Sequence, residues 1–376
     1  MRIALIAPGF IPSQTANSIQ VMKMAQALAA EGYRVHVFTP GTEEKISWKD
    51  LEAHYGLAHR FKVTRLPARP LLRRYDFAFT ALRAARAWGA ELIYTRLPQA
   101  ATLAAWRGWP SVFELHDMPS GIMGPWLLRR FLRAKGARRV VVNTHYLAGQ
   151  LKQQYRLPSL NDILLVAPNG VDLQRYVKLP SPKSARKKLE LTEAFTAGYS
   201  GHLYKGRGIG LILALAQHLP KMRFLLVGGR PVDVAYWKGK ASGLKNVQFT
   251  GFIPNAELPL YQAACEVLLI PYSQRVAGSS GINIAPYTNP LKMFEYLAAG
   301  RPIVASDLPI LREILSEQNA VILRGAQVQT WVTALASLQR SPRWRAALAK
   351  AARQTAADHS WEKRARMLLR GLPASR

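Results

Sequence analysis

The stretch from Val267 to Asp307 constrains the fold more than any other part of the chain. It opens with a short apolar run, 267–272, typical of a buried strand, and continues through a polar loop, 273–289, that contains Gly and Ser. A helix is predicted to begin near Pro290, whose fixed φ suits a first helical position, and to end at Gly300 before a second apolar run. Strand, loop, helix and strand in this order form a βαβ unit, so the sequence predicts a parallel α/β sheet.

Two charged residues stand in the first turns of this predicted helix. Lys292 and Glu295 are three residues apart and therefore share one helix face. In parallel sheets, ligands bind beyond the carboxyl ends of the strands, where helix N-termini present free N–H groups to anions. A cation and a carboxylate at that edge can hold a phosphate and a sugar hydroxyl. An exposed ion pair on a surface helix explains the same spacing without function, and by spacing alone it is the commoner arrangement.

The residues themselves favour the functional interpretation. The run from Pro290 to Ala305, Pro-Leu-Lys-Met-Phe-Glu-Tyr-Leu-Ala-Ala-Gly-Arg-Pro-Ile-Val-Ala, resembles the donor-binding signature of the retaining GT-B glycosyltransferases of family 4, the group with a Glu-x7-Glu motif. In that family the second glutamate binds the ribose hydroxyls of a nucleotide sugar, and Glu295 stands at its place. The first glutamate helps to position the donor sugar, and Tyr287 stands at its place here. The resemblance also implies that Pro290 and Leu291 contact the donor.

The resemblance implies a fold of two Rossmann-like, doubly wound α/β domains that face each other across a cleft, with a C-terminal helix that crosses back. A chain of 376 residues is long enough for two domains of about 150 residues each. We predict an acceptor-binding domain over 1–175, completed by a helix in 358–376, and a donor-binding domain over 176–357. The Pro-, Ser- and Lys-rich segment 178–188 marks the boundary.

The first half opens with an apolar run, 2–7, a loop rich in Pro, Gly and Ser, and a helix that Asn17 or Ser18 is predicted to cap. This opening lacks Gly-x-Gly-x-x-Gly, which disfavours a dinucleotide cofactor. In the family resembled, the equivalent loop approaches the donor or acceptor, so Ala16, Asn17 and Ser18 are predicted on the acceptor side. A plain capping role explains them equally well. Further strands are expected at residues 34–38, 61–66, 91–95, 112–116 and 140–143, and the next apolar run, 163–172, ends in a turn.

The strand at 112–116 places His116 at its carboxyl end, which is the ligand edge of such a sheet. A histidine there can donate to a sugar hydroxyl or orient the acceptor, although a histidine bonded beneath a loop gives the same sequence. The resemblance implies that this histidine lines the active site, with Asp117 as a candidate acceptor contact. Arg96, which ends the preceding predicted strand, is a weaker candidate for the same cleft.

The second half opens with a predicted strand, a glycine-rich loop that ends at Gly208, and an apolar helix over 209–219. Backbone N–H groups and the helix dipole of such a loop can cradle a phosphate, although four glycines alone are a weak signal. The loop resembles the family's diphosphate-binding loop, Gly-Arg-Leu ending in Lys-Gly. The residues that this implies for donor binding are Gly201, His202 at the arginine place, Lys205 as a compensating cation, and Arg207 at the lysine place.

Two further segments are predicted to border the nucleotide. The strand at 223–229 ends in Val-Gly-Gly, where Gly229 suits close approach of a nucleotide. The run 247–254 resembles the family segment that contacts the donor base, so Phe252 and Ile253 are predicted in the base pocket. Core packing explains these two residues nearly as well. Beyond the signature stretch, helices are expected at 311–315 and 327–338.

The predicted chemistry is transfer of a sugar from a nucleoside diphosphate to an acceptor hydroxyl, and the resemblance implies retention of configuration. The catalytic predictions are His116, Arg207 and Lys292, the latter two because cations stabilise the charge that develops on the leaving diphosphate. The sequence shows no cluster of Asp, Glu and His with metal-ligand spacing, so neither metal nor cofactor is expected. A GT-B sugar-nucleotide epimerase remains an alternative. So does a non-catalytic nucleotide-sugar binding subunit, which Tyr287 motivates.

The formal charge of +30 is unusual and favours polyanionic partners. Two segments mix arginines with bulky apolar residues, 69–75 and 126–139, and the second is predicted as a helix with Leu127, Leu128 and Phe131 on one side. Such a helix can lie on an anionic bilayer at about 1 kcal/mol per basic residue, or its apolar face can pack on the sheet. No nucleic-acid motif is present, so no nucleic acid is expected.

Localisation follows from what the sequence lacks. The chain shows neither an evident N-terminal signal nor a run of eighteen apolar residues, and its single cysteine, Cys265, fits a reducing compartment. We therefore expect a cytoplasmic protein at the inner face of the cytoplasmic membrane, with lipid-linked or polysaccharide acceptors of the cell envelope. Cys265 stands in an apolar setting that is typical of a core residue rather than a nucleophile.

Overall fold

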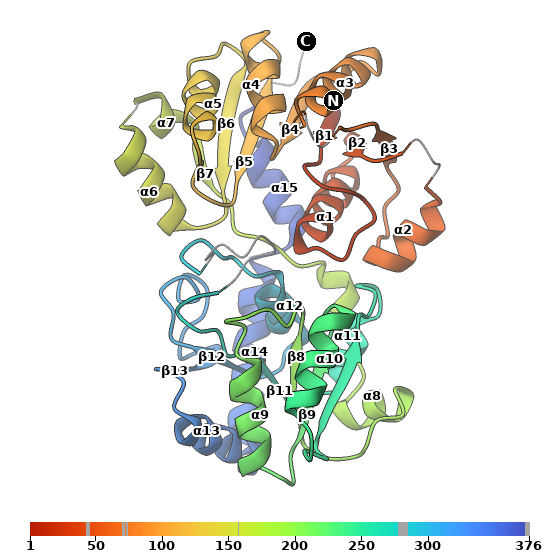
Figure 1. The fold of residues 1–376 in the computed structure, drawn as a ribbon, viewed down its shortest axis with the longest axis vertical. Coiled ribbons are helices and arrows are strands. Elements are labelled where there is room, and N and C mark those ends of the chain that lie inside the picture. The colour runs from red at the N-terminus through yellow and green to blue at the C-terminus, as the bar shows by residue number, and fades with distance from the viewer. Residues whose placement is uncertain (43–45, 70–71, 73, 157, 277–284, 373–376) are drawn as a thin grey trace. The chain divides into compact units, whose positions relative to one another are not determined.

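The computed structural model divides the chain into two compact units (Figure 1). It describes residues 1–42, 46–69, 72, 74–156, 158–276 and 285–372. Unit 1 comprises Met1–Asn169 and Trp361–Arg376, and unit 2 comprises Gly170–Ser360. The chain thus passes between units at the Asn169–Gly170 turn, not at residue 175, and returns after Ser360, not after 357. A Pro-Asn-Gly sequence suits a sharp change of direction, whereas the Pro- and Lys-rich segment behind it belongs to a helix of unit 2.

Unit 1 contains a seven-stranded parallel sheet in the order β3-β2-β1-β4-β5-β6-β7. Every strand predicted for this half is present. The strands are β1 (Arg2–Ile6), β2 (Arg34–Pro40), β3 (Lys62–Leu66), β4 (Leu92–Thr95), β5 (Ser111–Leu115), β6 (Ala137–Val142) and β7 (Leu164–Val166). The central strand β1 pairs Ile3 with Val35 of β2 and with Leu92 of β4, and the strand order reverses between β1 and β4. Such a reversal opens a ligand-binding crevice at the carboxyl ends of the strands.

The helices of unit 1 cover both faces of this sheet. They are α1 (Ala16–Ala30), α2 (Trp48–Tyr55), α3 (Tyr75–Ala87), α4 (Pro98–Trp106), α5 (Met123–Leu132), α6 (His145–Tyr155), α7 (Pro158–Ile163) and the returning α15 (Trp361–Leu369). The prediction that Asn17 or Ser18 caps α1 is wrong. Thr15 is the cap, and its hydroxyl accepts from the N–H of Ser18 at 3.3 Å. Helix α15 packs against α1 and so completes unit 1 from the far end of the chain.

Helix α5 settles the orientation of the segment 126–139. Leu127, Leu128 and Phe131 are buried in unit 1, so this apolar face packs inward and, of the two alternatives, the one in which it lies on a membrane is wrong. The physical reason is that these side chains complete the core above β5, where Phe131 meets Phe113 at 5.4 Å between ring centroids. The other basic segment, 69–75, lies partly outside the described residues.

Among the described helices, none is long and apolar enough to cross a membrane.

Unit 2 contains a six-stranded parallel sheet in the order β10-β9-β8-β11-β12-β13. The strands are β8 (Thr196–Ser200), β9 (Arg223–Val227), β10 (Val247–Gly251), β11 (Val267–Ile270), β12 (Ile303–Ser306) and β13 (Ala320–Leu323). The helices are the 3-10 helix η2 (Leu173–Tyr176), α8 (Pro182–Lys188), α9 (Ile209–His218), α10 (Pro231–Lys240), α11 (Leu258–Ala263), α12 (Leu291–Ala299), α13 (Val328–Arg340) and α14 (Pro342–Ala357). Here the strand order reverses between β8 and β11, which marks the ligand edge of this unit.

The stretch that begins at Val267 folds as predicted into β11, α12 and β12, and Gly300 ends α12 with a left-handed φ of 58°. Residues 277–284 of the predicted loop lie outside the described residues. The helix predicted at 311–315 is wrong, because that segment consists of turns. Five residues are too few to nucleate a helix unaided, and Asp307 draws Arg312 back toward β12 at 2.6 Å.

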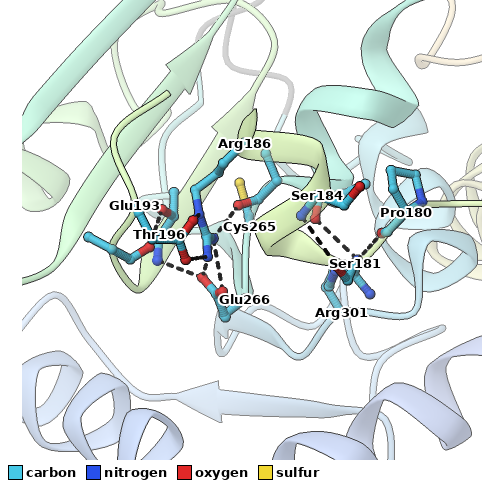
Figure 2. A network of polar contacts seen from close by, with 12 residues as sticks. Pro180, Ser181, Ser184, Arg186, Glu193, Thr196, Cys265, Glu266 and Arg301 are labelled. Atoms are coloured by element: carbon cyan, nitrogen blue, oxygen red, sulfur yellow. Dashed lines mark hydrogen bonds and ion pairs between the residues drawn. The ribbon is translucent and has the colours of Figure 1, made fainter. Parts of the chain in front are cut away.

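A polar network at the amino ends of β8 and β11 joins α8 to this sheet (Figure 2). The buried Arg186 guanidinium donates to both carboxylate oxygens of Glu266, at 2.8 and 2.9 Å, and to Glu193 at 2.8 Å. Glu266 in turn accepts from the N–H of Thr196, the first residue of β8, at 2.7 Å. The network lies at the edge of the sheet opposite to the ligand edge, so its role is structural. Beside it, burial raises the pKa of the Cys265 thiol to about 12, which excludes a nucleophilic role at neutral pH.

We expect Arg186→Met to lower the free energy of unfolding by about 2–3 kcal/mol, because Glu266 would be left without its charged donor. Urea unfolding followed by circular dichroism measures the change. Lys187→Met, the same substitution at the neighbouring exposed residue, is the control and should have little effect. Equal stability of the two variants would contradict a structural role for the network.

His36 on β2 is a second buried polar group with consequences for stability. Its Nε2 is hydrogen-bonded to Thr64 Oγ1 at 2.8 Å, and its ring lies 4.1 Å from the Phe38 ring and 5.1 Å from the Trp88 ring. Burial, reinforced by the charge of Lys62, lowers the pKa of His36 to about 4. The imidazole is therefore neutral in the folded protein at neutral pH.

A pH dependence of stability follows from His36. Between its folded pKa of about 4 and its usual pKa of 6.5 the unfolded chain binds the extra proton, so stability falls as the pH drops through this window. The loss should reach about 3 kcal/mol near pH 4. Urea unfolding at pH 7 and pH 4.5 should give a smaller difference for His36→Asn than for the wild type, while the exposed His59→Asn keeps the full difference. An unchanged difference in His36→Asn would refute the assignment.

Candidate functional site

Glycines end the strands at the ligand edge of unit 2. Gly201 follows β8 with φ 122°, and Gly228 and Gly229 follow β9 with φ 107° and 93°. The N–H of Gly201 donates to the carbonyl of Val227 at 2.8 Å, and a Cβ on Gly228 would lie 2.7 Å from the Gly201 carbonyl oxygen. Only glycine permits this approach, so the edge exposes backbone rather than side chains.

The loop from Gly201 to Gly208 packs closely on the segment after β11. A Cβ on Gly206 would lie 2.0 Å from the carbonyl oxygen of Arg275, and one on Gly208 would lie 1.9 Å from that of Pro271. The N–H of Ser273 donates to the Gly206 carbonyl at 2.9 Å. The loop is therefore fixed across the point where the strand order reverses, with the N-terminus of α9 directly behind it.

This packing brings the two predicted cations together. The Arg207 guanidinium carbon lies 4.8 Å from the centre of the Tyr272 ring, and Lys292 Nζ lies 5.5 Å from the same centre. Lys292 Nζ also lies 3.5 Å from the centre of the Tyr199 ring, and a Cβ on Gly201 would be 3.0 Å from it. Residues distant in sequence thus converge on one edge, as the sequence predicts.

Lys292 is an unusual cation because its ammonium has no hydrogen-bond partner among the described residues, although it is buried. Burial, and then the charge of Arg207, lower the pKa of Lys292 well below its usual range, while Glu295 acts in the opposite direction. Arg207 Nε is likewise buried without a hydrogen bond in the described part of the chain. Unsatisfied buried donors cost stability. Two of them side by side indicate a site for an anion.

Glu295 lies one helical turn from Lys292 on α12, and its side chain is buried. One carboxylate oxygen accepts from Asn255 Nδ2 at 3.2 Å and the other from Gln262 Nε2 at 3.3 Å. Each oxygen retains a lone pair for a hydroxyl donor. Among the described residues Lys292 and Glu295 form no salt bridge, so the alternative of an exposed ion pair on a surface helix is wrong.

Other side chains hold this carboxylate and helix in place, and sequence reasoning did not single them out. Arg175 donates to Asn255 Oδ1 at 2.7 Å, and the Tyr176 hydroxyl donates to Gln262 Oε1 at 3.0 Å. The Tyr296 hydroxyl accepts from the N–H of Ser200 at 2.7 Å and so ties α12 to the end of β8. Sequence reasoning also passed over Tyr199 and Tyr272. Their position near the carboxyl ends of predicted strands was a signal that could have placed them at the ligand edge.

The remaining predicted donor residues lie around this edge with different degrees of exposure. His202 stacks on Tyr204 with 4.6 Å between ring centroids, and the Arg230 guanidinium lies 4.9 Å from the Tyr204 ring centre. Lys205 is exposed, Phe252 is 37% exposed, and Ile253 packs partly into the core. Pro290 caps α12 and is buried, while Tyr287 and Leu291 are half-buried. Their contacts with a donor remain predictions.

In unit 1 the predicted acceptor-side residues gather at the ends of β4 and β5. Arg96 donates to Asn17 Oδ1 at 2.6 Å, and His116 Nε2 is 2.6 Å from Glu114 Oε1. Burial, and then the charge of Arg96, lower the pKa of His116 to about 4, so the neutral imidazole donates to the Glu114 carboxylate at neutral pH. Burial raises the pKa of Asp117, and Arg96 opposes that shift.

Two of the predicted acceptor-side residues, Ala16 and Ser18, lie at the start of α1. Ser18 is buried and its hydroxyl donates to the carbonyls of Ser13, at 2.7 Å, and Thr15, at 2.9 Å. It therefore stabilises the start of α1 and has no hydroxyl proton left to offer a ligand. Ala16 is exposed at the first helical position and offers a ligand only backbone.

Glu114 and Arg364 form a buried ion pair that the sequence alone did not reveal. Arg364 from α15 donates to Glu114 Oε1 at 2.8 Å, and the two residues are 2% and 1% exposed. The Tyr94 hydroxyl donates to the other oxygen of Glu114. Burial alone would raise the pKa of Glu114, but Arg364 and His116 lower it below its usual range. The carboxylate therefore orients His116 while α15 fixes the carboxylate.

Within the described ranges, no group of three His, Cys, Asp or Glu residues is placed to hold a metal ion.

Comparison with known proteins finds relatives for both units. A family model described as Glycosyltransferase Family 4 matches residues 18–175, and a model described as Glycosyl transferase-like matches residues 207–370. Over 143 residues the chain is 32% identical to the putative teichuronic acid biosynthesis glycosyltransferase TuaH of Bacillus subtilis. This aligned part makes up 38% of this chain and 34% of that relative. It is 21% identical to the phosphatidyl-myo-inositol mannosyltransferase of Mycobacterium leprae over 84% of this chain and 81% of the relative.

Solved structures share the fold over nearly the whole chain. Sucrose-phosphate synthase from Thermosynechococcus elongatus superposes with a TM-score of 0.74 at 20% identity, covering 97% of this chain and 96% of that one. Alr3699/HepE from Anabaena, solved in complex with UDP-glucose, gives a TM-score of 0.73 at 18% identity and covers 99% of each chain. At these identities the likeness shows the fold alone.

Proposed function

The chain belongs to the glycosyltransferases of family 4 with the GT-B fold, and from this premise we propose that it transfers a sugar from a nucleoside-diphosphate sugar to an acceptor hydroxyl. The observation that carries the proposal is that two buried donors beside the glycine edge of unit 2, the Lys292 ammonium and the Nε of the Arg207 guanidinium, lack hydrogen-bond partners among the described residues. A diphosphate supplies the acceptors that these groups lack.

The donor would be held in two places. Arg207, Lys292 and the free N–H groups before α9 would bind the diphosphate, and Glu295 would accept hydrogen bonds from the ribose hydroxyls. The amides of Asn255 and Gln262 already orient the carboxylate for this task. A preorganised site of this kind does not have to rearrange when the ligand arrives, which favours both binding and catalysis.

The rate enhancement would come from charge stabilisation. As the bond between the sugar and the diphosphate breaks, negative charge grows on the leaving oxygen. Fixed cations at that oxygen interact more strongly with the transition state than with the intact donor, so they lower the barrier rather than merely tighten binding. His116, neutral and hydrogen-bonded to Glu114, would contact a sugar or acceptor hydroxyl from unit 1. We propose retention of configuration and no requirement for a metal.

The acceptor would be a glycolipid or polysaccharide precursor of the cell envelope, assembled at the inner face of the cytoplasmic membrane. Support comes from the relatives, which include a phosphatidyl-myo-inositol mannosyltransferase and an alpha-monoglucosyldiacylglycerol synthase of Streptococcus pneumoniae, 21% identical over 85% of this chain and 74% of that relative.

Two assays test the proposal in sequence. A thermal-shift screen of nucleoside diphosphates and their sugars should first identify one base that raises the melting temperature. Radiolabelled donor of that base, incubated with an envelope lipid extract, should then deliver label to lipid with one nucleoside diphosphate released per sugar. Conversion of the donor to an isomeric nucleotide sugar would support an epimerase instead. Binding without turnover on any acceptor would support a non-catalytic subunit.

A further inference from the structure

Three tyrosines with buried side chains lie at the ligand edge of unit 2, beside the two predicted cations. They are Tyr199 on β8, Tyr272 just after β11 and Tyr296 on α12, and they are 1%, 3% and 0% exposed. A buried tyrosine usually has a hydrogen-bond partner for its hydroxyl, because a polar group is costly to bury alone. Each of the three hydroxyls is therefore expected to have a partner.

The hydroxyls of Tyr199 and Tyr296 hold the start of the glycine loop and the strand before it. The Tyr199 hydroxyl donates to the carbonyl of His202 at 2.6 Å. The Tyr296 hydroxyl accepts from the N–H of Ser200 at 2.7 Å and lies 3.2 Å from the Ser200 hydroxyl. These bonds join the loop and α12 to the end of β8, so both hydroxyls have structural roles.

The Tyr272 hydroxyl differs from these two, because it is buried and has no hydrogen-bond partner among the described residues. Arg207 lies nearby: burial lowers the pKa of its guanidinium, but Tyr272 and Tyr199 hold that pKa above its usual value. Even so, the hydroxyl and the guanidinium do not meet with the geometry of a hydrogen bond. Phenylalanine would fill the same volume without the cost of an unpaired hydroxyl. Packing alone therefore does not explain a tyrosine at this position.

The main chain on either side of Tyr272 is fixed by the glycine loop. The carbonyl oxygen of Pro271 lies so close to Gly208 that a Cβ on that glycine would be 1.9 Å away. The N–H of Ser273 donates to the carbonyl of Gly206 at 2.9 Å. With its main chain held and its ring buried, Tyr272 keeps its hydroxyl inside unit 2 at the ligand edge.

The neighbours of the Tyr272 hydroxyl decide which ligand it suits. The Arg207 guanidinium carbon and Lys292 Nζ lie 4.8 and 5.5 Å from the centre of the Tyr272 ring. In their charged forms both groups carry only donors, so neither can accept the phenol proton. A ligand that satisfies all three must bring several acceptor oxygens and negative charge, as a phosphate does. A sugar hydroxyl would satisfy the phenol but leave the two cationic groups without an anion.

We propose that the Tyr272 hydroxyl donates a hydrogen bond to a phosphate oxygen of the nucleoside diphosphate, as a third and uncharged donor beside Arg207 and Lys292. The inference rests on the proposed function, and it adds a binding residue to the site of the diphosphate. No proton is transferred in this step. The hydroxyl orients the diphosphate, and its hydrogen bond strengthens as negative charge grows on the leaving group.

Isothermal titration of the nucleoside diphosphate selected by the thermal-shift screen into wild type and Tyr272→Phe tests the proposal. The dissociation constant should be about tenfold higher for Tyr272→Phe, since a hydrogen bond to a charged group contributes about that factor. The corresponding nucleotide sugar should show a similar increase, because it carries the same diphosphate. The melting temperature of the empty variant should equal or exceed that of the wild type, because the removed hydroxyl forms no bond with the described residues.

Two further tyrosine-to-phenylalanine variants separate binding from stability. Tyr236→Phe, at an exposed tyrosine of α10, should match the wild type in both measurements. Tyr296→Phe should lower the melting temperature by a few degrees, because the N–H of Ser200 would lose its acceptor.

A dissociation constant of Tyr272→Phe equal to that of the wild type would overturn the inference and leave the proposed function standing. So would an increase confined to the nucleotide sugar, because the hydroxyl would then contact the sugar and not a phosphate. A melting temperature of Tyr272→Phe as low as that of Tyr296→Phe would assign the hydroxyl a structural role instead. Failure of the wild type to bind any nucleoside diphosphate would refute the proposed function, and this inference with it.

Discussion

Lys292→Met is expected to slow sugar transfer by about two to three orders of magnitude in kcat, the loss typical for removal of one preorganised group that stabilises developing charge. The reason lies in the environment of the ammonium. It is buried over the Tyr199 ring, beside Arg207 and against the backbone of Gly201, with no hydrogen-bond partner in the described structure. The Lys292 ammonium therefore forms its hydrogen bonds and its ion pair only when an anion binds beside it.

The same substitution is expected to leave stability unchanged or to raise it. Methionine fills a similar volume without the cost of an unpaired buried cation. Loss of activity together with a retained or higher melting temperature is the pattern of a residue kept for function at the expense of stability. Transfer kinetics and thermal unfolding of one preparation measure both quantities.

Lys221→Met is the matched control, since Lys221 is an exposed lysine of unit 2 that stands just before β9, at the amino end of the strand. Its kcat and melting temperature should equal those of the wild type. If Lys292→Met retained wild-type kcat, the ammonium would have no part in the chemistry. A marked fall in its melting temperature would instead assign Lys292 a structural role.

Arg364→Met should have the largest effect on stability, about 3–5 kcal/mol, because breaking a buried ion pair strands the remaining charge. Arg364 donates to Glu114 at 2.8 Å and to the carbonyls of Ala167 and Pro168 at 3.2 and 2.9 Å. All of these acceptors would lose the Arg364 donor at once, and among the described residues Glu114 would keep only hydrogen bonds from Gln20, Tyr94 and His116. Because α15 is the last helix of unit 1, the loss should also free the end of the chain. Urea unfolding measures the change, and amide hydrogen exchange locates it.

Arg366→Met provides the control two residues away, where an exposed arginine pairs with Glu31 at the surface. Its effect should stay below about 1 kcal/mol. The double variant Glu114→Gln/Arg364→Met should recover part of the lost stability, because no buried charge then remains. A double variant as unstable as the sum of its single variants would contradict a direct Glu114–Arg364 interaction.

The parallel sheets could be predicted because their strands are continuous apolar runs bounded by loops. Such runs are typical of strands that are buried on both faces, and the predicted strands of unit 1 occur where the sequence indicates. The strand β13 was missed because three of its four residues are only half-buried and the pattern is short. The Thr15 cap was missed because Asn17 and Ser18 are equally good caps by residue type, and only the backbone decides among them.

Within the site, sequence reasoning identified the charged residues but not their supports. Arg207 and Lys292 were found through the glycine loop and the signature helix, and the structure brings them together on Tyr272. Asn255 and Gln262 come from other elements of unit 2, and amides in a loop and a short helix carry no signal of their own. Glu114 escaped notice for a related reason, since its partner Arg364 lies at the other end of the chain.

The most direct test of the account is isothermal titration of the nucleoside diphosphate chosen by the thermal-shift screen into wild type and Lys292→Met. Because the pKa of Lys292 is lowered in the empty site, a bound diphosphate should raise it and draw in a proton. Binding should therefore weaken as the pH rises. The account predicts a dissociation constant about 10- to 100-fold higher for Lys292→Met than for the wild type, and a weaker dependence of binding on pH in the variant. Equal dissociation constants for the two proteins would contradict it.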